Sequence, residues 1–386
     1  MHIAMVFMAF PVPSETFAVR DVRALRKLGH VVDTLSLRGD DKAVTPGSCL
    51  EYLRAIFWKP GLARLLALAM RIAFSRGWGW GEKAKCLFLL ANAARLANRL
   101  AKRQPDVVHM FWGHYPALVL LLAKPFLPNT RFTLFLGAYD LEKKLAVSKW
   151  AAACSDTLFT HAHANLADIS RFIGEKQVNV VHRGIELDAY PAMDELGFEG
   201  RGRRIFTAGR LIVEKGFDKV ILAFAEVVRH YPDAILAIAG DGPDGARLGQ
   251  VADKLGIAQN VQFLGWLSEE EVRRQLFASR VFMLLSSKPG ERLPNSLKEA
   301  MAAGCICITS YSPGIDELVK HGVDGFICEA GDLAAILDAV VFGFGAPGAN
   351  TMSLAAARKI RAGFDVNVSA RKYVECWTSV MNQVIQ

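Results

Sequence analysis

The 386-residue chain lacks the features that mark several classes of protein. It contains no collagen-like period, no heptad run and no low-complexity tract, which excludes fibrous and coiled-coil proteins. With 52% apolar residues, 32 glycines and 15 prolines, its composition is also unlike that of disordered chains. At about 150 residues per domain, the length predicts two or three domains, each with its own core.

Long apolar runs are absent too. Two uncharged stretches, 107–123 and 339–357, are broken by polar residues, glycine and proline, whereas a membrane-spanning helix needs about 18 or more apolar residues. Residues 1–7 lack the basic segment and cleavage site of a secretory signal. We therefore expect a cytoplasmic protein without a spanning helix.

The cysteines give no framework of disulfides or metal ligands. There are seven, an odd number, with no C-x-x-C and no cysteine–histidine spacing that resembles a zinc site. Buried thiols in a reducing compartment are the expectation, and no metal site is predicted.

Positive charge is concentrated in one stretch. The net charge is +8, but residues 51–104 hold eleven bases and only two acids, so this segment carries +9 and the rest −1. It is also rich in Leu and Ala and contains Trp58, Trp78 and Trp80. Basic helices with apolar faces suit an anionic membrane surface, and ordinary packed helices with snorkelling bases are the alternative. No nucleic-acid-binding motif accompanies the charge, so nucleic acid is not expected as a partner.

Short β-rich runs alternate with helical patterns in two series. The first series of runs comprises residues 3–8, 31–37, 106–110, 132–136, 157–160 and 178–181. The second comprises residues 205–208, 234–239, 261–264, 281–285, 305–309 and 325–328. Such alternation predicts an α/β fold of two doubly wound parallel sheets, with ligands at the carboxyl ends of the strands. The domains are expected at 1–184 and 204–365, joined by a linker at 185–203.

The first strand leads into a helix with clear end signals. Ser14 is a good N-cap, apolar residues follow at helical spacing, and Gly29 ends the pattern. The apolar positions are Ala18, Val22, Leu25 and Leu28.

The turn after the strand at 205–208 has the chemistry of an anion site. Arg210 and Lys215 lie between Gly209 and Gly216, just before a helix. Here the backbone can approach a ligand, the helix dipole favours an anion, and two cations can neutralise a diphosphate. Two solvated surface bases are the alternative.

A second glycine turn matches G-x-G-x-x-G through Gly240, Gly242 and Gly245. This pattern belongs in the first strand–helix turn of a dinucleotide-binding domain, and here that turn is 209–216. We therefore interpret it as a tight turn beside a nucleotide, not as a nicotinamide or flavin site.

Two carboxylates, Glu291 and Glu299, flank a predicted helix start at Pro294 and Asn295. Carboxylates accept hydrogen bonds from vicinal sugar hydroxyls, and exposed N–H groups at a helix start bind phosphate. Ser296 and Glu299 also fit a capping box, which is an equally good local explanation for Glu299.

Together these motifs resemble the retaining glycosyltransferases of family 4. The resemblance rests on 209–216, on 240–243 and 261–265, and on the Glu291-x7-Glu299 segment with the Ala-Met-Ala-Ala-Gly run after Glu299. The N-terminal Ser-Glu-Thr-Phe run further resembles members that build bacterial exopolysaccharide and lipid-linked saccharides. The resemblance implies the GT-B fold, in which two Rossmann-like domains face each other across a cleft. It also implies that residues 366–386 form a helix that returns to the first domain.

The resemblance also implies site roles and a reaction. A sugar would pass with retention from a nucleotide-sugar, the substrate, to a hydroxyl, with no metal and no other cofactor. Arg210, Lys215 and Glu291 would be catalytic, with the first two on the diphosphate. The donor would further contact a set made up of Gly209, Gly240, Leu264, Gly265, Leu293, Pro294, Asn295 and Glu299.

The acceptor, a saccharide or lipid-linked saccharide, would bind to the N-terminal domain. Candidate residues on that side are Ser14, Glu15, His109, His114, Tyr139 and Asp140. Two positions depart from the family: Gly137 stands where many relatives have histidine, and Arg292 where they have glycine. These departures leave open an alternative, a catalytically weak, membrane-docked subunit of a polysaccharide assembly complex. In either case we expect a peripheral protein at the inner face of the cell membrane.

Overall fold

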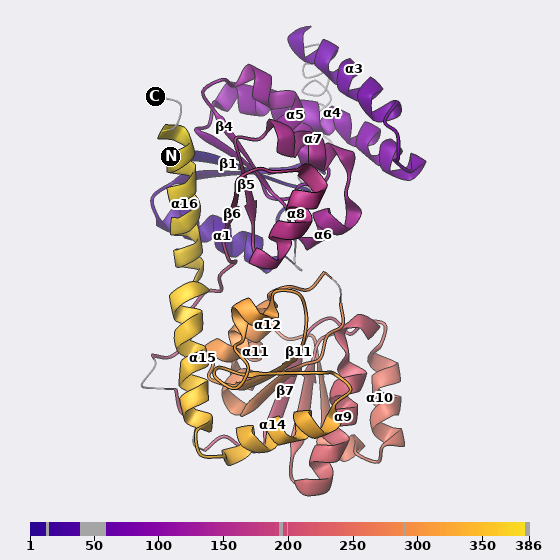
Figure 1. Cartoon of the computed structure of the whole chain (residues 1–386), viewed down its shortest axis with the longest axis vertical. Coiled ribbons are helices and arrows are strands. Elements are labelled where there is room, and N and C mark those ends of the chain that lie inside the picture. Colours follow the sequence, from indigo (N-terminus) through magenta and orange to yellow (C-terminus); the bar gives the residue numbers. More distant parts are fainter. Residues whose placement is uncertain (13–14, 39–58, 193–195, 199, 289, 383–386) are drawn as a thin grey trace. The chain divides into compact units, whose positions relative to one another are not determined.

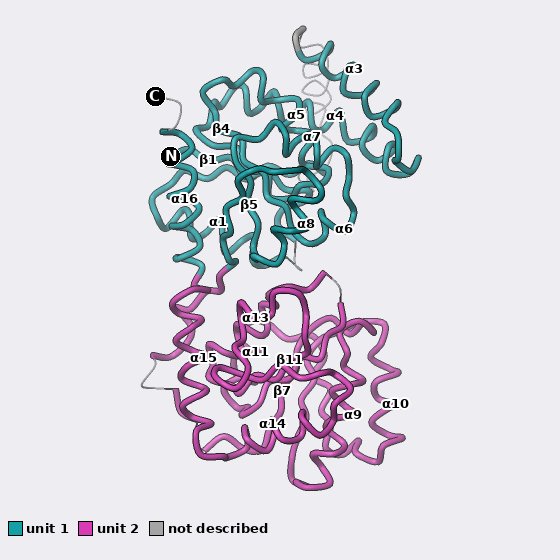
Figure 2. The backbone as a smooth tube through the Cα atoms, viewed as in Figure 1, with its two compact units in different colours: residues 1–183, 366–386 teal, residues 184–365 magenta. Residues whose placement is uncertain are grey.

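The computed structural model describes residues 1–12, 15–38, 59–192, 196–198, 200–288 and 290–382 (Figure 1). The chain folds into two units (Figure 2). Unit 1 comprises residues 1–183 and 366–386, and unit 2 comprises residues 184–365.

Unit 1 is built on a six-stranded parallel sheet in the order β2-β1-β3-β4-β5-β6. Its strands are β1 His2–Phe7, β2 Val31–Ser36, β3 Val107–Met110, β4 Arg131–Phe135, β5 Thr157–Thr160 and β6 Val178–Val180. Its helices are α1 Thr16–Lys27, α3 Lys59–Ala73, α4 Trp80–Arg103, α5 Ala117–Ala123, α6 Ala138–Lys143, α7 Ala146–Cys154, α8 Leu166–Ile173 and α16 Val366–Asn382, with 3-10 turns η1 Lys124–Phe126 and η2 His163–Asn165.

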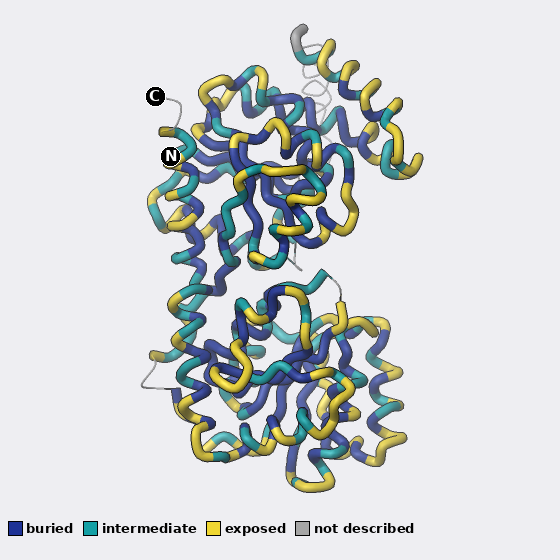
Figure 3. Tube along the Cα trace, in the orientation of Figure 1, coloured by how far each residue is buried: buried dark blue, intermediate teal, exposed yellow. Residues whose placement is uncertain are grey.

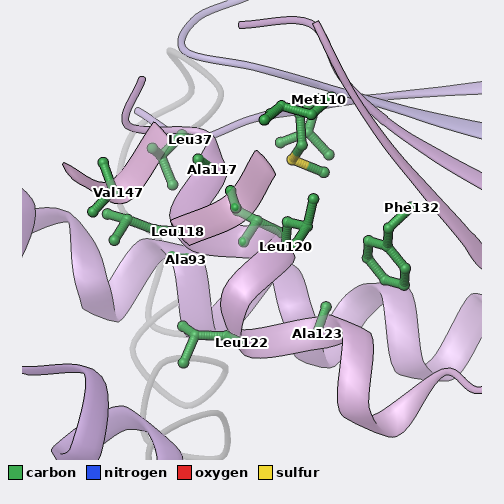
Figure 4. Packing of buried hydrophobic residues seen from close by; sticks show 14 of the residues in the cluster. Leu37, Ala93, Met110, Ala117, Leu118, Leu120, Leu122, Ala123, Phe132 and Val147 are labelled. Atoms are coloured by element: carbon green, nitrogen blue, oxygen red, sulfur yellow. The ribbon is translucent and has the colours of Figure 1, made fainter. Parts of the chain in front are cut away.

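Helices cover both faces of this sheet because strand residues alternate between the faces. Ala4 and Val6 of β1 face a core shared with α3, α4, α5 and α7, and Figure 4 shows part of this core around Leu118, Leu120 and Phe132. Ile3 and Met5 belong to a second core, which α1 and α16 cover. A sheet buried on both faces explains why its strands read as continuous apolar runs.

Helix α1 shows how local sequence sets an element. Ala18, Val22 and Leu25 are buried as the spacing predicts, and Gly29, with φ of +83°, follows the end of the helix. The predicted N-cap, Ser14, lies outside the described residues. The cap position is Glu15, whose side chain makes no capping hydrogen bond.

Unit 2 holds a second six-stranded parallel sheet, in the order β12-β11-β10-β7-β8-β9. Its strands are β7 Arg204–Ala208, β8 Ile235–Ala239, β9 Val261–Gly265, β10 Val281–Leu284, β11 Ile306–Ser310 and β12 Phe326–Cys328. Its helices are α9 Phe217–His230, α10 Gly245–Lys254, α11 Glu269–Ala278, α12 Asn295–Ala302, α13 Ile315–Leu318, α14 Leu333–Gly345 and α15 Ala349–Gly363, with 3-10 turns η4 Val213–Lys215 and η5 Ala258–Asn260. The predicted strands of both units are observed, each with its ends within one residue of the predicted ends.

The stretch predicted as a linker, 185–203, belongs to unit 2. Leu196 and Phe198 are buried, and Phe198 joins the unit 2 core. Arg201 donates hydrogen bonds to the Ala303 and Ser279 carbonyl oxygens at 2.8 and 3.0 Å. Its apolar residues follow neither a helical nor a strand period, so the sequence predicted a linker, although the stretch packs on unit 2.

Among the described residues, no single helix is long and apolar enough to cross a membrane. The pair α14 and α15 passes that test only together, and it bends by 95° at the break.

Truncating the α16 anchor tests the second core of unit 1. Trp377 is fully buried there, in contact with His109 and Tyr373. We expect Trp377→Ala to lower the free energy of unfolding of unit 1 by about 3–5 kcal/mol, through lost burial and the cavity left behind. The exposed neighbour Ser379 is the control. In the same urea titration, Ser379→Ala should change the free energy of unfolding by less than about 0.5 kcal/mol. Equal small effects of both variants would contradict the assigned packing.

Candidate active site

The strand order of unit 2 reverses between the adjacent strands β7 and β10. In doubly wound sheets, ligands bind outside the carboxyl ends of the strands at such a point. The loop that follows β7 is Gly209–Gly216, and the loop that follows β10 starts at Leu285, contains Glu291 and ends at Pro294, before α12. The two motifs that the sequence singles out therefore start from adjacent strands at the expected crevice.

These two loops pack backbone against backbone. Gly216 has φ of +68°, and a Cβ placed there would lie 2.0 Å from the Leu285 carbonyl oxygen. The Ser287 N–H donates to the Glu214 carbonyl oxygen at 2.9 Å, and the Ser286 hydroxyl donates to the same oxygen at 3.1 Å. Only glycine fits at 216, so this residue fixes how closely the loops approach.

An ion pair joins the loops. The Lys215 Nζ donates to Glu291 Oε1, and the two side chains are only 16% and 12% exposed. Glu291 Oε2 is buried and has no hydrogen-bond partner among the described residues. Arg210, in the same loop, is exposed. The site thus combines a buried pair with spare acceptor capacity and a cation open to solvent.

The turn after β8 explains the second glycine motif. A Cβ at Gly240 would lie 1.8 Å from the Gly209 carbonyl oxygen, and one at Gly242 would lie 2.3 Å from the Leu211 carbonyl oxygen. The Gly240 N–H donates to the Gly265 carbonyl oxygen at 2.7 Å, which ties β9 and its Leu264–Gly265 end to the same cluster. These glycines are required by backbone packing around the 209–216 turn.

Helix α12 begins directly after Pro294, whose position is the N-cap. Ser296 therefore lies inside the helix and no side-chain capping bond forms, so the capping-box explanation of Glu299 is wrong. Glu299 is half-buried in the second turn, and Leu293 and Pro294 are buried in the loop before it. The Asn295 amide oxygen accepts from the buried Lys298 Nζ at 3.1 Å.

Unit 1 contains a cavity of about 620 Å³ at the carboxyl side of its own sheet. Met8, Arg38, Tyr115 and Tyr139 line it from segments that follow β1, β2, β3 and β4. Residues of α4 with Lys143 and Leu145 close it; the α4 residues are Glu82, Lys85, Phe88, Leu89 and Asn92. Of these residues, the sequence pattern indicated only Tyr139 as a site residue, although Lys85 belongs to the basic stretch 51–104.

His114 lies beside this cavity, after β3. Its ring contacts the rings of Tyr139 and Trp112, and its Nδ1 accepts the Tyr115 N–H at 2.9 Å. Burial, with help from the Arg38 charge, lowers the pKa of His114 to about 4. The ring is therefore neutral at pH 7.

His109 is a core histidine, which corrects its place among the acceptor-side candidates. It is fully buried on the α16 face of β3, and its Nδ1 is hydrogen-bonded to Thr133 Oγ1 at 2.8 Å. Burial, followed by the Arg183 charge, lowers its pKa to about 3. The strand alternation that buries Val107 and Phe111 on this face places His109 there too.

Asp140 is buried at the start of α6, and its Oδ2 accepts the Gly137 N–H at 2.9 Å. Burial raises its pKa to about 7, against the opposing effects of the Gly137, Gly113 and His114 N–H groups and the Arg183 charge. A Cβ at Gly137 would approach the Phe135 and Trp112 rings at 3.2 and 3.3 Å. Aromatic rings therefore lie where the resemblance leads us to expect histidine.

The Arg183 guanidinium was missed by the sequence analysis. It is buried over the rings of Phe17, Phe111, Trp112 and Phe135, at 4.4–4.9 Å from their centres. These aromatic residues are far apart in the sequence, so no local pattern could reveal the cluster. Glu15, at the cap position of α1, is half-buried, and Tyr139 is about half exposed.

The chain is similar in sequence and fold to several known proteins. Residues 191–341 match the family described as "Glycosyl transferases group 1". The chain is 26% identical to "Amylovoran biosynthesis glycosyltransferase AmsK" of Erwinia amylovora, over 97% of this chain and 98% of that protein. It is 27% identical to "UDP-Gal:alpha-D-GlcNAc-diphosphoundecaprenol alpha-1,3-galactosyltransferase" of Escherichia coli, over 70% and 74% of the two chains. The solved structure of Anabaena Alr3699/HepE in complex with UDP and glucose is similar with a TM-score of 0.69, at 16% identity, covering 98% of this chain and 100% of that one.

Together the fold and the sequence similarity indicate the class of protein. The chain has the GT-B fold, and its sequence is similar to glycosyltransferases over residues 191–341 and, for AmsK, over nearly its full length. Residues 191–341, most of unit 2, form its group 1 glycosyl transferase domain, and this domain contains the 209–216 turn and the Glu291 to Glu299 segment.

The raised pKa of Asp140 predicts how the stability of the protein changes with pH. Between about pH 4 and pH 7 the folded chain binds a proton at Asp140 that the unfolded chain has lost, so this group favours folding less as the pH rises. We expect the stability of the wild type to fall relative to Asp140→Asn over this window. Groups that titrate alike in both proteins cancel in the difference between their free energies of unfolding, so this difference reports on Asp140. A difference that is constant from pH 4 to 7 would contradict the raised pKa.

Proposed function

We propose that this protein transfers a sugar from a nucleotide-sugar, with retention and without a catalytic metal, to a hydroxyl of a saccharide or lipid-linked acceptor in bacterial cell-surface polysaccharide synthesis. The names of its relatives support the polysaccharide and lipid-linked setting. The observation that carries the proposal is the Lys215–Glu291 pair where the loops of β7 and β10 meet. The donor is a UDP- or GDP-sugar, and the relative that uses UDP-Gal favours UDP.

In this proposal the donor diphosphate lies along the 209–216 turn. Arg210 is exposed and can reach it, and Lys215 exchanges its carboxylate partner for phosphate oxygens. A diphosphate carries more charge than one carboxylate, so this exchange is favourable in a partly buried site. Negative charge grows on the leaving group during reaction, and fixed cations stabilise it most at that moment.

Release of Lys215 frees Glu291 to accept hydrogen bonds from the hydroxyls of the transferred sugar. Its Oε2 already has that capacity, because it is buried with no partner in the described part of the chain. Glu299 takes the ribose hydroxyls, and the segment Leu293–Asn295 with the α12 N-terminus contacts sugar and phosphate. Gly240, Leu264 and Gly265 line the base side, where the turns after β7, β8 and β9 meet.

The transfer itself then needs few groups. The bond between the sugar C1 and the diphosphate oxygen breaks, and C1 bonds to the acceptor oxygen on the same face. The leaving phosphate oxygen takes the acceptor proton. No side chain is required as a nucleophile, and charge stabilisation is the dominant contribution of the protein.

The acceptor binds to unit 1 at the 620 Å³ cavity, with His114, Tyr139 and Glu15 on its side of the sheet. Arg38, Lys85 and Lys143 give this cavity a basic wall, while Phe88, Leu89 and Leu145 give it an apolar one. A phosphate-bearing lipid-linked saccharide matches both walls. Asp140 positions the β3 and β4 loops through their N–H groups.

Removing a diphosphate cation should slow turnover with the fold intact. We expect Arg210→Ala and Lys215→Ala each to lower turnover by about 10²-fold or more, measured as nucleoside diphosphate release from the donor. Lys219→Ala, a base on α9 after the turn, serves as the control and should retain nearly full turnover. Near-normal turnover in Lys215→Ala would overturn the diphosphate assignment.

Alanine variants of Glu291 and Glu299 should differ in which ligand they bind less tightly. Glu299→Ala is expected to weaken binding of the free nucleoside diphosphate, because it removes a ribose contact. Glu291→Ala should leave that binding intact and weaken the nucleotide-sugar, since only the sugar contact is lost. Calorimetric titration of both ligands decides the point, and normal binding of the free nucleotide by both variants would refute the ribose role of Glu299.

The basic part of unit 1 is proposed to hold the protein at the cytoplasmic leaflet. Each base near an anionic surface contributes about 1 kcal/mol, and salt screens this attraction. We therefore expect sedimentation with anionic but not neutral vesicles, weakened by high salt and by combined reversal of Arg64, Arg71 and Arg76 to glutamate. Equal binding to neutral vesicles, or none to either, would mean that these helices are only a packed face. Donor hydrolysis without vesicle binding would still support the enzyme, whereas vesicle binding without donor binding would favour the membrane-docked subunit.

A further inference from the structure

A second cavity of unit 1 lies outside the site described above. It measures about 650 Å³, in the size range of pockets for small molecules, and runs between α3, α5 with η1, and the end of α7. Its floor is apolar, with Leu68, Leu120, Leu121, Pro125 and Pro128 among the residues that line it. Glycosyl transfer as proposed makes no use of this groove.

Three cations line the groove: Arg64 and Arg71 from α3, and Lys124 from η1. The Arg71 guanidinium lies 4.0 Å from the centre of the Trp150 ring, and that of Arg64 lies 5.3 Å from the centre of the Phe126 ring. Neither arginine makes an ion pair within the part of the chain that the structure describes, whereas Lys124 is paired with Asp156 at 2.5 Å. Stacking on a ring leaves the guanidinium edge able to donate to an anion.

Helix α3 adds an exposed apolar ridge next to the groove. Leu66, Met70 and Phe74 recur every four residues from α3 into the residue after it, and they are 54%, 58% and 83% exposed. Figure 3 shows exposed stretches along α3. Residues at this spacing lie on one side of a helix. Arg64, Ala67 and Arg71 lie on the side of α3 that lines the groove. A large apolar surface in water, beside cations, indicates a partner that is itself apolar and anionic.

We propose that this groove binds a single anionic phospholipid of the bilayer. The phosphate lies between Arg64 and Arg71, an acyl chain lies on the apolar floor, and the ridge enters the membrane beside them. This inference rests on the proposed membrane docking and sharpens it, because diffuse attraction needs no groove. A free phosphate would satisfy the arginines but leave the floor and ridge exposed, so the lipid is the better match.

The test uses the full chain and dihexanoylphosphatidylglycerol below its micelle concentration, with saturable binding measured by calorimetry. Three variants are compared with the wild type. Arg64→Glu/Arg71→Glu reverses the groove charges, and Ala67→Trp fills the groove without changing the charge. Lys102→Glu/Arg171→Glu is the matched control, because both bases are exposed on unit 1 and neither lines the groove.

If the groove binds the lipid, both groove variants should weaken lipid binding at least tenfold. The control variant should bind the lipid within twofold of the wild type. Cys154 lines the groove and its thiol is exposed and free, so bound lipid should also slow its alkylation at least threefold, with the half-buried Cys376 as internal reference.

Several results would overturn the groove. One is equal weakening by the control variant, and another is full binding by Ala67→Trp. Equally tight binding of inorganic phosphate or of dihexanoylphosphatidylcholine would do the same. Donor hydrolysis is measured in parallel. If the wild-type protein hydrolyses no donor, the proposed function has failed. If it hydrolyses the donor but binds no lipid, only the lipid-binding groove is refuted.

Discussion

The proposed donor site depends on the contact between the loops that follow β7 and β10. Gly216 allows the two backbones to meet, and Lys215 and Glu291 then pair across the contact with little exposure to water. Burying such a pair costs desolvation energy that offsets most of its attraction, so the pair adds little to stability. What it provides is a cation and a carboxylate held at fixed positions where the strand order reverses. A ligand that offers phosphate to one and hydroxyls to the other can replace the internal contact at both ends.

Unit 1 repeats the sheet architecture with different chemistry at its carboxyl edge. Its cavity has one basic and one apolar wall, and its candidate histidine is buried and neutral. Aromatic rings fill the space around Gly137 and surround Arg183, so the loops after β3 and β4 are fixed by packing and by N–H bonds to Asp140. A histidine that stays neutral, on loops fixed by packing, agrees with the proposed mechanism in which the leaving phosphate takes the acceptor proton.

The sequence predicted the sheets well because their strands are buried on both faces and read as apolar runs between glycine-rich turns. Local pattern also placed the 209–216 turn and the α12 start correctly. It failed where tertiary contacts decide the outcome. The spacing of Ser296 and Glu299 suggested a capping box, but the N-cap position is Pro294, two residues before Ser296. Histidine is a residue type common in active sites, yet the alternation of side chains along β3 buries His109 in the core. Arg38 and Lys143 reach one cavity, and Arg183 reaches its aromatic cluster, only through the fold, so no spacing in the sequence predicts these positions.

The central claim is that unit 2 holds the diphosphate of a nucleotide-sugar at the junction of the β7 and β10 loops. The most direct measurement is binding of a panel of UDP- and GDP-sugars to the whole protein, followed by thermal unfolding and calorimetry in the presence of a metal chelator. Ligands that bind the folded state raise its stability by mass action. The account predicts that at least one nucleotide-sugar raises the unfolding temperature, that the chelator leaves this shift unchanged, and that the matching sugar 1-phosphate has no effect. No shift with any member of the panel, or a shift abolished by the chelator, would contradict it.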